Sequence, residues 1–388
     1  MRLNLLVVGS ENPRIRDFFG EVARDANVSY LDTSPITRLP NLDQLCRSWR
    51  WRKRGTDTAE AHLLVPKRYQ ELSTNLTHWF CRRSFAQFGK ADAVIFTWPQ
   101  LCFLAEKFTD ITRVYYCKDP FELWMWGPEF IRPLETRLLN NVDAVFAVSR
   151  LLTWDLAPRT TAKTFYLPNG FCDWFVPEAD SPRPRDLPPG KPVIGSVGQI
   201  NDDYDWDYVQ YIAEELPDVN IAFLGNLKEP DPAAQRRIHR ILTRTPNILW
   251  LGWRKYKRVP VYMHHCDILM NFLKADDLGN RRSPLRLYDY LTTSRPIIST
   301  GVAEAYPHKP HIHVAADGPE AVQAIREILA GRHPIDLEAR REYASSQSWQ
   351  VRASQFLEQL TPIIEARKNP AKTSSPARDV DRVSLIRA

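Results

Sequence analysis

The sequence lacks the features that mark several classes of protein. No apolar run approaches the roughly 20 residues that a membrane-spanning helix needs. The run near the N-terminus ends at Val8, and Glu11, Arg14 and Arg16 follow, which is typical of a buried strand rather than a signal peptide. The six cysteines include no CxxC pair and no zinc-ligand spacing. We therefore expect no disulfide framework and no metal site, and a reduced, cytoplasmic compartment.

Common phosphate-binding and nucleophile motifs are also missing. The chain contains no P-loop, no GxGxxG and no GxSxG segment, and we expect no resident cofactor. The composition is that of an ordinary globular protein, with 44% hydrophobic and 25% charged residues. A length of 388 residues suits two or three domains, and a formal charge of +6 favours an anionic ligand or surface.

Short apolar runs alternate with helical patterns in the first half of the chain. A strand is predicted at 3–8, a tight loop follows at Gly9, and 14–23 carries apolar residues at helical spacing. Further strands are predicted at 93–96, 113–116 and 144–148. This alternation predicts a parallel sheet covered by helices on both faces.

A proline-rich polar stretch at 177–192 predicts a linker, and the alternation restarts beyond it. Predicted strands lie at 193–197, 220–224, 248–251, 268–272 and 296–299, and helices at 206–216, 233–243 and 285–291. The expected fold class is α/β, with two doubly wound, Rossmann-like domains facing each other across a cleft. The predicted divisions are a first domain at 1–176, the linker, a second domain at 193–346, an amphipathic helix at 347–367 and a mobile tail at 368–388.

The order of motifs in the second half resembles a known family. Gly-Ser-Val-Gly at 195–198, Leu-Gly-Trp-Arg at 251–254 and Ser-Pro-Leu-Arg-Leu-Tyr-Asp-Tyr-Leu at 283–291 are similar to the donor domain of GT-B glycosyltransferases. Within that fold they resemble the large group 1, family 4-like set of bacterial capsule, teichuronic-acid and exopolysaccharide transferases. The segment 142–171 resembles the hinge of that family more loosely. The resemblance implies a GT-B fold whose last helix, here containing Trp349, returns to the first domain.

The resemblance also implies that the donor diphosphate binds where 281–286 opens a helix. Serine is a good helix cap and proline suits the first helical position, so Ser283 and Pro284 are expected to start this helix. The N–H groups of a helix start and nearby arginines both suit phosphate. The expected diphosphate-binding residues are Arg281, Arg282, Ser283, Pro284 and Arg286. The alternative is a capped helix with solvated arginines.

Two further donor contacts follow from the resemblance. Asp289 stands where the family has a glutamate that accepts hydrogen bonds from ribose hydroxyls; the alternative is an exposed helix aspartate. Gly252, Trp253 and Arg254 follow a strand end where relatives hold the nucleobase, although a tryptophan there is as often packing. Many relatives carry a second glutamate at the position of Arg282, and its absence leaves the stereochemistry of transfer open.

On the acceptor side, Asp119 follows a predicted strand of the first domain, where its loop faces the expected cleft. It is the candidate general base for the acceptor hydroxyl if the reaction inverts, and orients the acceptor if it retains. Glu129 and Glu135, on a predicted helix, are second choices. A simple turn aspartate before Pro120 is the alternative.

Basic residues and tryptophans alternate in one segment of the first half. Such a mixture suits an anionic membrane surface, with the rings at the interface. The residues concerned are Trp49, Arg50, Trp51, Arg52 and Lys53. A plain solvated face is the main alternative, and single-stranded nucleic acid the least favoured.

These patterns together predict a glycosyltransferase that uses a nucleoside-diphosphate sugar, expected to be a UDP-sugar, as substrate. The expected acceptor is a glycan or a lipid-linked molecule in surface-polysaccharide synthesis, and the expected location is cytoplasmic, peripheral to the inner face of the membrane. One alternative is a non-catalytic glycan- or membrane-binding scaffold derived from a transferase. Another is a nucleotide-sugar epimerase of the same fold.

Overall fold

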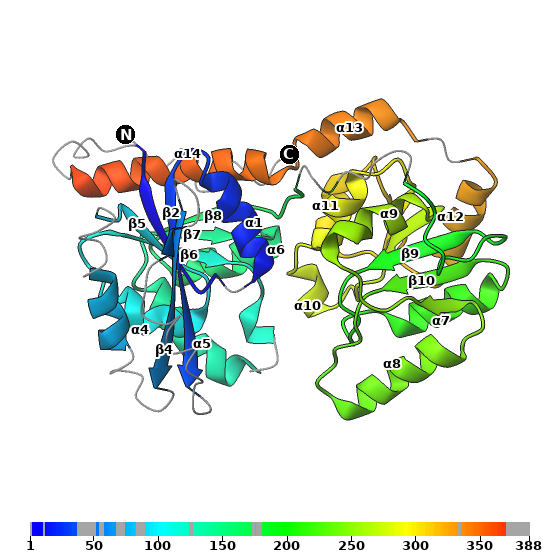
Figure 1. The fold of residues 1–388 in the computed structure, drawn as a ribbon, viewed down its shortest axis with the longest axis horizontal. Coiled ribbons are helices and arrows are strands. Elements are labelled where there is room, and N and C mark those ends of the chain that lie inside the picture. The colour runs from blue at the N-terminus through cyan, green and yellow to red at the C-terminus, as the bar shows by residue number, and fades with distance from the viewer. Residues whose placement is uncertain are drawn as a thin grey trace.

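A computed structural model describes most of the chain as two α/β domains that lie side by side (Figure 1). The residues described are 2–10, 12–36, 52–53, 58–66, 74–82, 90–123, 127–172, 175, 181–332 and 335–369.

The first domain is built on an eight-stranded sheet in the order β3-β4-β2-β1-β5-β6-β7-β8. The strands are β1 (Asn4–Val8), β2 (Asn27–Ile36), β3 (Arg52–Lys53), β4 (Thr58–Pro66), β5 (Ala93–Phe96), β6 (Thr112–Cys117), β7 (Ala144–Ala147) and β8 (Lys163–Tyr166). The described pairs are parallel except β3 with β4. The helices of this domain include α1 (Pro13–Val22), α4 (Cys102–Ala105), α5 (Gly127–Leu139) and α6 (Arg150–Leu156), and residues 74–82 are also helical.

The second domain is built on a six-stranded parallel sheet in the order β11-β10-β9-β12-β13-β14. The strands are β9 (Val193–Val197), β10 (Asn220–Leu224), β11 (Ile248–Trp250), β12 (Ile268–Asn271), β13 (Ile297–Ser299) and β14 (His313–Val314). The helices are α7 (Trp206–Glu215), α8 (Pro232–Arg244), α9 (Val259–His264), α10 (Asp277–Asn280), α11 (Leu285–Leu291), α12 (Gly318–Leu329) and α13 (Leu337–Ser345).

Local sequence explains why these elements form. The central strands β1, β5 and β7 consist almost entirely of apolar residues and are buried along nearly their whole length, as in a parallel sheet with helices on both faces. Polar side chains start the helices. Asn12, Asp205 and Asp231 each accept a hydrogen bond from a backbone N–H in the first turn of α1, α7 and α8.

The last helix, α14 (Trp349–Lys368), follows the second domain in the chain but packs on the first (Figure 1). The ring centroid of Phe18 on α1 lies 5.4 Å from that of Trp349 and 5.6 Å from that of Phe356. The chain therefore crosses between the domains twice. The two crossings lie next to each other, because Phe171 and Ser348 form a parallel β-bridge.

The fold class predicted from the sequence is confirmed. Each predicted strand and helix is present with its ends shifted by a few residues, whereas several other elements were not predicted, among them β2, β3, β4, β8, β14, α4, α6, α10, α12 and α13. The described part of the predicted linker, 181–192, packs on the second domain: Leu187 is buried in its core, and Arg183 Nη1 donates a hydrogen bond to the carbonyl oxygen of His265 at 3.4 Å. The domain boundaries drawn from the sequence remain predictions.

None of the described helices combines the length and the apolar character that crossing a membrane would require. Within the same part of the chain, histidine, cysteine and acidic residues form no group that could hold a metal ion.

Candidate active site

The carboxyl ends of the two sheets meet at the domain interface. The loop after β7 reaches the second domain through Ser149, whose hydroxyl donates a hydrogen bond to the carbonyl oxygen of Arg281 at 2.6 Å. The loop after β8 does so through Asn169, whose Nδ2 donates to the carbonyl oxygen of Ser283 at 2.8 Å. Because ligands of parallel α/β sheets bind at this edge, the interface is the candidate active site.

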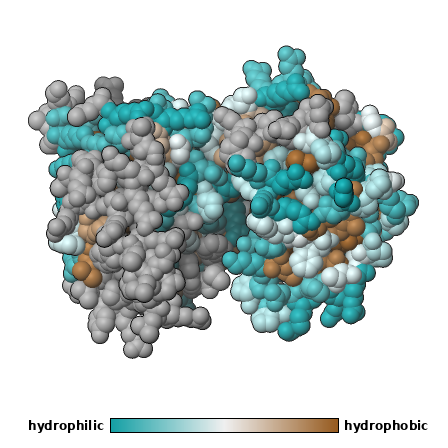
Figure 2. Space-filling view, viewed as in Figure 1, coloured by the Kyte–Doolittle hydropathy of each residue, from teal (hydrophilic) through white to brown (hydrophobic). Residues whose placement is uncertain are grey.

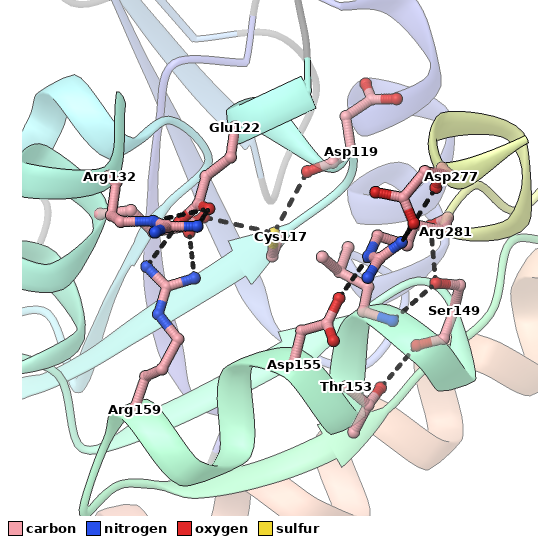
Figure 3. Close-up of polar contacts among 12 residues, drawn as sticks. Cys117, Asp119, Glu122, Arg132, Ser149, Thr153, Asp155, Arg159, Asp277 and Arg281 are labelled. Carbon is pink, nitrogen blue, oxygen red and sulfur yellow. Dashed lines mark hydrogen bonds and ion pairs between the residues drawn. The ribbon is translucent and has the colours of Figure 1, made fainter. Parts of the chain in front are cut away.

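Arg281, a predicted diphosphate contact, is held by two carboxylates. Figure 3 shows its guanidinium between Asp155 on α6 and Asp277 on α10, with an ion pair to each. Asp155 belongs to the first domain and Asp277 to the second. The Arg281 side chain therefore joins the domains, and its charge is already compensated by neighbouring acids.

Arg282 lies between two other acids of the interface. Its Nη1 donates to Asp203 Oδ2 at 2.5 Å, and its Nε lies 3.7 Å from Oδ1 of Asp119, the predicted acceptor-side residue. Burial raises the pKa of Asp119, whereas the positive charges of Arg282 and Lys118 lower it. The structure thus places Asp119 at the interface of the two domains.

The predicted start of the diphosphate helix needs a correction. Helix α11 begins at Leu285, with Pro284 rather than Ser283 at the cap position and no side-chain capping hydrogen bond. The Ser283 hydroxyl instead lies 3.2 Å from the Tyr288 hydroxyl and accepts a hydrogen bond from Asn169 N at 3.4 Å. The Ser283 hydroxyl thus bonds to the chain segment that connects the two domains and not to the first turn of α11. The prediction that Ser283 caps the helix was wrong.

Arg286 differs from Arg281 and Arg282. Its guanidinium carbon lies 4.6 Å from the centre of the Tyr204 ring, and a Cβ added to Gly198 would lie 3.0 Å from its Nη2. Its Nη1 is buried and has no hydrogen-bond partner within the part of the chain that the structure describes. A buried cationic nitrogen without an acceptor is costly, so an anion placed beside Gly198 would complete its hydrogen bonding.

Glycine is required where the loops after β9 and β10 touch. A Cβ added to Gly225 would lie 1.8 Å from the carbonyl oxygen of Gly198, and Gly198 itself has a φ of +134°. The close approach of these two loops fixes the backbone under the Arg286 guanidinium.

Asp289, the predicted ribose contact, is buried and pairs with the first domain. Its Oδ2 lies 3.1 Å from Nη2 of Arg14 on α1, and the Arg14 guanidinium also covers the Tyr256 ring at 4.4 Å. Burial raises the pKa of Asp289 to about 6, against the lowering effect of Arg14. Oδ1 of Asp289 has no hydrogen-bond partner among the described residues. The carboxylate can therefore accept a further hydrogen bond.

If Asp289 accepts hydrogen bonds from the donor ribose, donor affinity should depend on pH. The raised pKa of about 6 means that this carboxylate becomes protonated as the pH falls through that value, and it then loses acceptor capacity. We expect UDP-sugar binding to be roughly tenfold weaker at about pH 5 than at about pH 8. Calorimetric titration across this range checks it. The control is Asp289→Asn, for which affinity should be lower and flat; a variant that keeps the slope would contradict the assignment.

The predicted base-binding residues lie after β11. Gly252 has a φ of +70°, and the Trp253 side chain is 58% exposed, which excludes the packing alternative for that ring. The Arg254 guanidinium is held by Asp186, and its Nε donates to the Tyr262 hydroxyl at 2.9 Å. Of the three, Trp253 is the one with an exposed side chain.

The remaining sequence candidates lie elsewhere. Glu135 is buried, accepts a hydrogen bond from the Tyr115 hydroxyl at 2.8 Å and pairs with Arg159 at 3.0 Å. Glu129 is exposed on α5. Figure 3 shows Arg159 grouped with Glu122 and Arg132 on the far side of Cys117 from Arg281. This ion-pair cluster explains Glu135 structurally, without a role at the interface.

The proposed membrane segment lies mostly outside the described residues. Trp49, Arg50 and Trp51 are not described, and for Arg52 and Lys53 only the backbone is, as β3.

No family model matches the chain. A curated relative is TuaH of Bacillus subtilis (strain 168), assigned as a glycosyltransferase of teichuronic acid biosynthesis; it is 24% identical over 281 residues, which are 67% of this chain and 70% of TuaH. The sequence resemblance to this set of transferases is thus confirmed.

Solved structures decide the fold. The sucrose-phosphate synthase from Thermosynechococcus elongatus superposes with a TM-score of 0.72 at 15% identity, over 94% of this chain and 100% of that one. The trehalose 6-phosphate synthase from Burkholderia multivorans gives 0.70 at 12% identity, over 94% and 100%. Anabaena HepE, in complex with UDP and glucose, gives 0.67 at 13% identity, over 93% and 100%. The fold is GT-B.

Besides Asp155 and Asp277, which hold Arg281, three residues of this GT-B interface were not identified from the sequence. Arg14 and Asp203 pair with predicted site residues, as described above. Glu304 is buried in the second domain and accepts hydrogen bonds from Arg150 N and the Tyr166 hydroxyl of the first, each at 2.7 Å. All three follow the carboxyl end of a strand, at β1, β9 and β13. Their position after a strand could have indicated these residues from the sequence, but it does not tell which residue of each loop contacts the other domain.

Proposed function

We propose that the protein is a glycosyltransferase that moves a sugar from a UDP-sugar to a glycan or lipid-linked acceptor in surface-polysaccharide synthesis. The GT-B fold and the similarity to TuaH support the reaction and the kind of product. The uridine donor is supported by the structures of HepE, whose complexes contain UDP or UDP-glucose.

The single observation that carries this proposal is the Arg286 guanidinium. It stands at the carboxyl edge of the second sheet beside the Gly198 backbone, and its Nη1 is buried without an acceptor among the residues described. A diphosphate supplies the missing charge and the missing oxygen atoms together. We assign the main diphosphate contact to Arg286. Arg281 and Arg282, with Ser283 and Pro284, are assigned to shaping the same loop.

The rest of the donor is assigned along α11 and the loop after β11. Asp289 accepts a hydrogen bond from the ribose through Oδ1, while its Oδ2 keeps the pair with Arg14. The base lies against Trp253, with Gly252 and Arg254 forming the loop that holds this ring. Donor binding in this arrangement uses both domains, because Arg14 belongs to the first.

Asp119 is proposed to act on the acceptor. In an inverting reaction its carboxylate accepts the proton of the acceptor hydroxyl while that oxygen bonds to the anomeric carbon. The bond from this carbon to the diphosphate breaks, and its electron pair leaves with UDP. In a retaining reaction Asp119 orients the acceptor. In both, Arg286 stabilises the charge that develops on the leaving diphosphate.

The proposal places the protein in the cytoplasm, peripheral to the inner face of the membrane, with Trp49 to Lys53 as one contact. The nucleotide sugar is a substrate, and neither a resident cofactor nor a metal is proposed. Nucleic acid is not proposed as a partner.

Thermal unfolding against a panel of nucleoside diphosphates and nucleotide sugars tests the donor. A ligand at 100 times its dissociation constant should stabilise the protein by about 2.7 kcal/mol, which is visible as a higher melting temperature. We expect UDP and one or more UDP-sugars to give this shift, and other nucleotides to give less. A protein that responds to no uridine nucleotide would contradict the proposal. Binding without transfer or hydrolysis over a broad acceptor set would favour the scaffold alternative.

A further inference from the structure

One stretch of the second domain carries basic residues and no acidic ones. Between Asp231 and Asp267 the chain contains no aspartate or glutamate. The arginines and lysines there are Arg236, Arg237, Arg240, Arg244, Arg254, Lys255, Lys257 and Arg258. In a protein with nearly balanced acids and bases, such a segment concentrates positive charge on one region of the surface.

Helix α8 presents part of this charge outward. Its Ile238, Ile241 and Leu242 are buried against the sheet. Arg236, Arg240 and Arg244 are exposed and follow one another at four-residue spacing, which places them in a line along one face. In Figure 1 the helix runs along the outer edge of the second domain, and Figure 2 shows that edge as hydrophilic. The apolar face of α8 packs on the core of the domain. The helix can therefore bind a partner through its charges but cannot insert an apolar face into it.

Further exposed basic residues follow α8 in the chain. β11 is the edge strand, and its Trp250 is 36% exposed with its ring 5.9 Å from that of His239 on α8. The short helix η5 (Tyr256–Arg258) and the residue before it add exposed Lys255, Lys257 and Arg258.

Most of these charges have no acidic partner. Arg237 pairs with Asp202, and Arg254 with Asp186. No ion pair involving the other six is found within the described ranges, and they form what we call the α8–η5 surface: Arg236, Arg240, Arg244, Lys255, Lys257 and Arg258. Its charge is therefore available to an external anion.

We propose that the α8–η5 surface docks on an anionic phospholipid bilayer. Its α8 part runs along the outer edge of the second domain (Figure 1), where a large flat partner can reach it. A bilayer gathers several basic residues at once, and an exposed tryptophan beside them suits the headgroup region. The line of arginines on α8 has no tryptophan, tyrosine or phenylalanine between its members, unlike the stacking platforms that hold single-stranded nucleic acid. The inference deepens the membrane location proposed above by assigning it to a second, separate surface.

Co-sedimentation of the full chain with lipid vesicles tests this docking. The probes are vesicles of phosphatidylcholine alone and of an equal mixture of phosphatidylcholine and phosphatidylglycerol. We expect binding to the anionic vesicles only, and a steep loss of binding with added salt, because exposed charges are screened. Equal binding to neutral vesicles, or no binding to either, would overturn the proposal.

Charge reversal separates the α8–η5 surface from the rest of the molecule. Arg240→Glu with Arg244→Glu should weaken the partition onto anionic vesicles by roughly 30-fold or more. The matched control, Lys163→Glu with Arg341→Glu, makes the same charge change at exposed positions on β8 and α13 and should bind nearly as well as the parent protein. Equal losses in the two variants, or a loss limited to changes at Trp49 to Lys53, would overturn the assignment.

Two readouts complete the experiment. Circular dichroism melting confirms that the charge-reversed variants fold. The thermal shift with UDP should be unchanged in them, since no α8 arginine is assigned to the donor, so failure of the docking proposal and failure of the donor proposal are distinguishable. Binding of a labelled single-stranded oligonucleotide that needs Arg240 and Arg244, with no vesicle binding, would replace the bilayer by nucleic acid.

Discussion

Replacement of Arg286 by alanine should weaken UDP-sugar binding by roughly 100-fold, because hydrogen bonds to charged groups each contribute about 1.5–3 kcal/mol. The free energy of unfolding should change by less than about 1 kcal/mol, since the guanidinium lies against the Tyr204 ring and the Gly198 backbone and has no ion pair among the described residues. Calorimetric titration with the UDP-sugar and urea unfolding measure the two quantities. Loss of affinity without loss of stability is the signature of a side chain held for its ligand.

Arg281→Ala is the matched control for Arg286→Ala. Arg281 lies four residues before α11 and Arg286 in its first turn. The positive charge of Arg281, however, is paired with Asp155 and Asp277. Its removal should change donor affinity by less than about tenfold while weakening the contact between the domains. If the two variants lose affinity equally, the distinction drawn here between arginines that hold the loop and the arginine that binds diphosphate is wrong.

Replacement of Gly225 by alanine should destabilise the second domain by at least about 3 kcal/mol. The new Cβ would lie 1.8 Å from the carbonyl oxygen of Gly198, a backbone atom that moves only if the loop after β9 moves. Because Gly198 lies against the Arg286 guanidinium, we also expect UDP-sugar binding to be lost. Urea unfolding followed by tryptophan fluorescence gives the change in stability.

Gly20→Ala is the opposite case and serves as the control. Gly20 lies in α1, and a Cβ added there meets nothing within 4 Å. Because glycine costs conformational entropy in a helix, alanine should stabilise the protein by roughly 0.5–1 kcal/mol. A Gly225→Ala protein as stable as its parent would mean that the loops after β9 and β10 are not in contact in solution.

The fold was predictable where an element carries a strong local pattern. β9 and β10 are short apolar runs that end in glycine-containing loops, and the periodicity of α8 sets three buried residues against a basic face. β14 has only two residues, His313 and Val314, and is a strand because it pairs with β13 rather than because of its own composition. Such an element is visible only once its neighbour is in place.

The candidate site was predictable only in part, for a similar reason. The resemblance located Arg286 and Asp289, which lie in one motif. The partner of Asp289 is Arg14, 275 residues away in the chain, and that of Arg282 is Asp203, 79 residues away. These pairs between distant residues decide which arginines have their charge neutralised by an acid, and no local sequence pattern predicts such pairs. The sequence therefore suggested five diphosphate residues together, whereas the proposal that Arg286 makes the main contact depends on those long-range pairs.

The path of α14 has a consequence for synthesis of the chain. The rings of Trp349 and Phe356 complete a core otherwise built from residues of the first domain, such as Phe18 and Tyr116. A ribosome makes these two rings only after the whole of the second sheet. The first domain is therefore synthesised early, but part of its core stays exposed until the second domain and α14 have been translated. The second domain, although it is synthesised after the first, can therefore complete its described core before the first domain does.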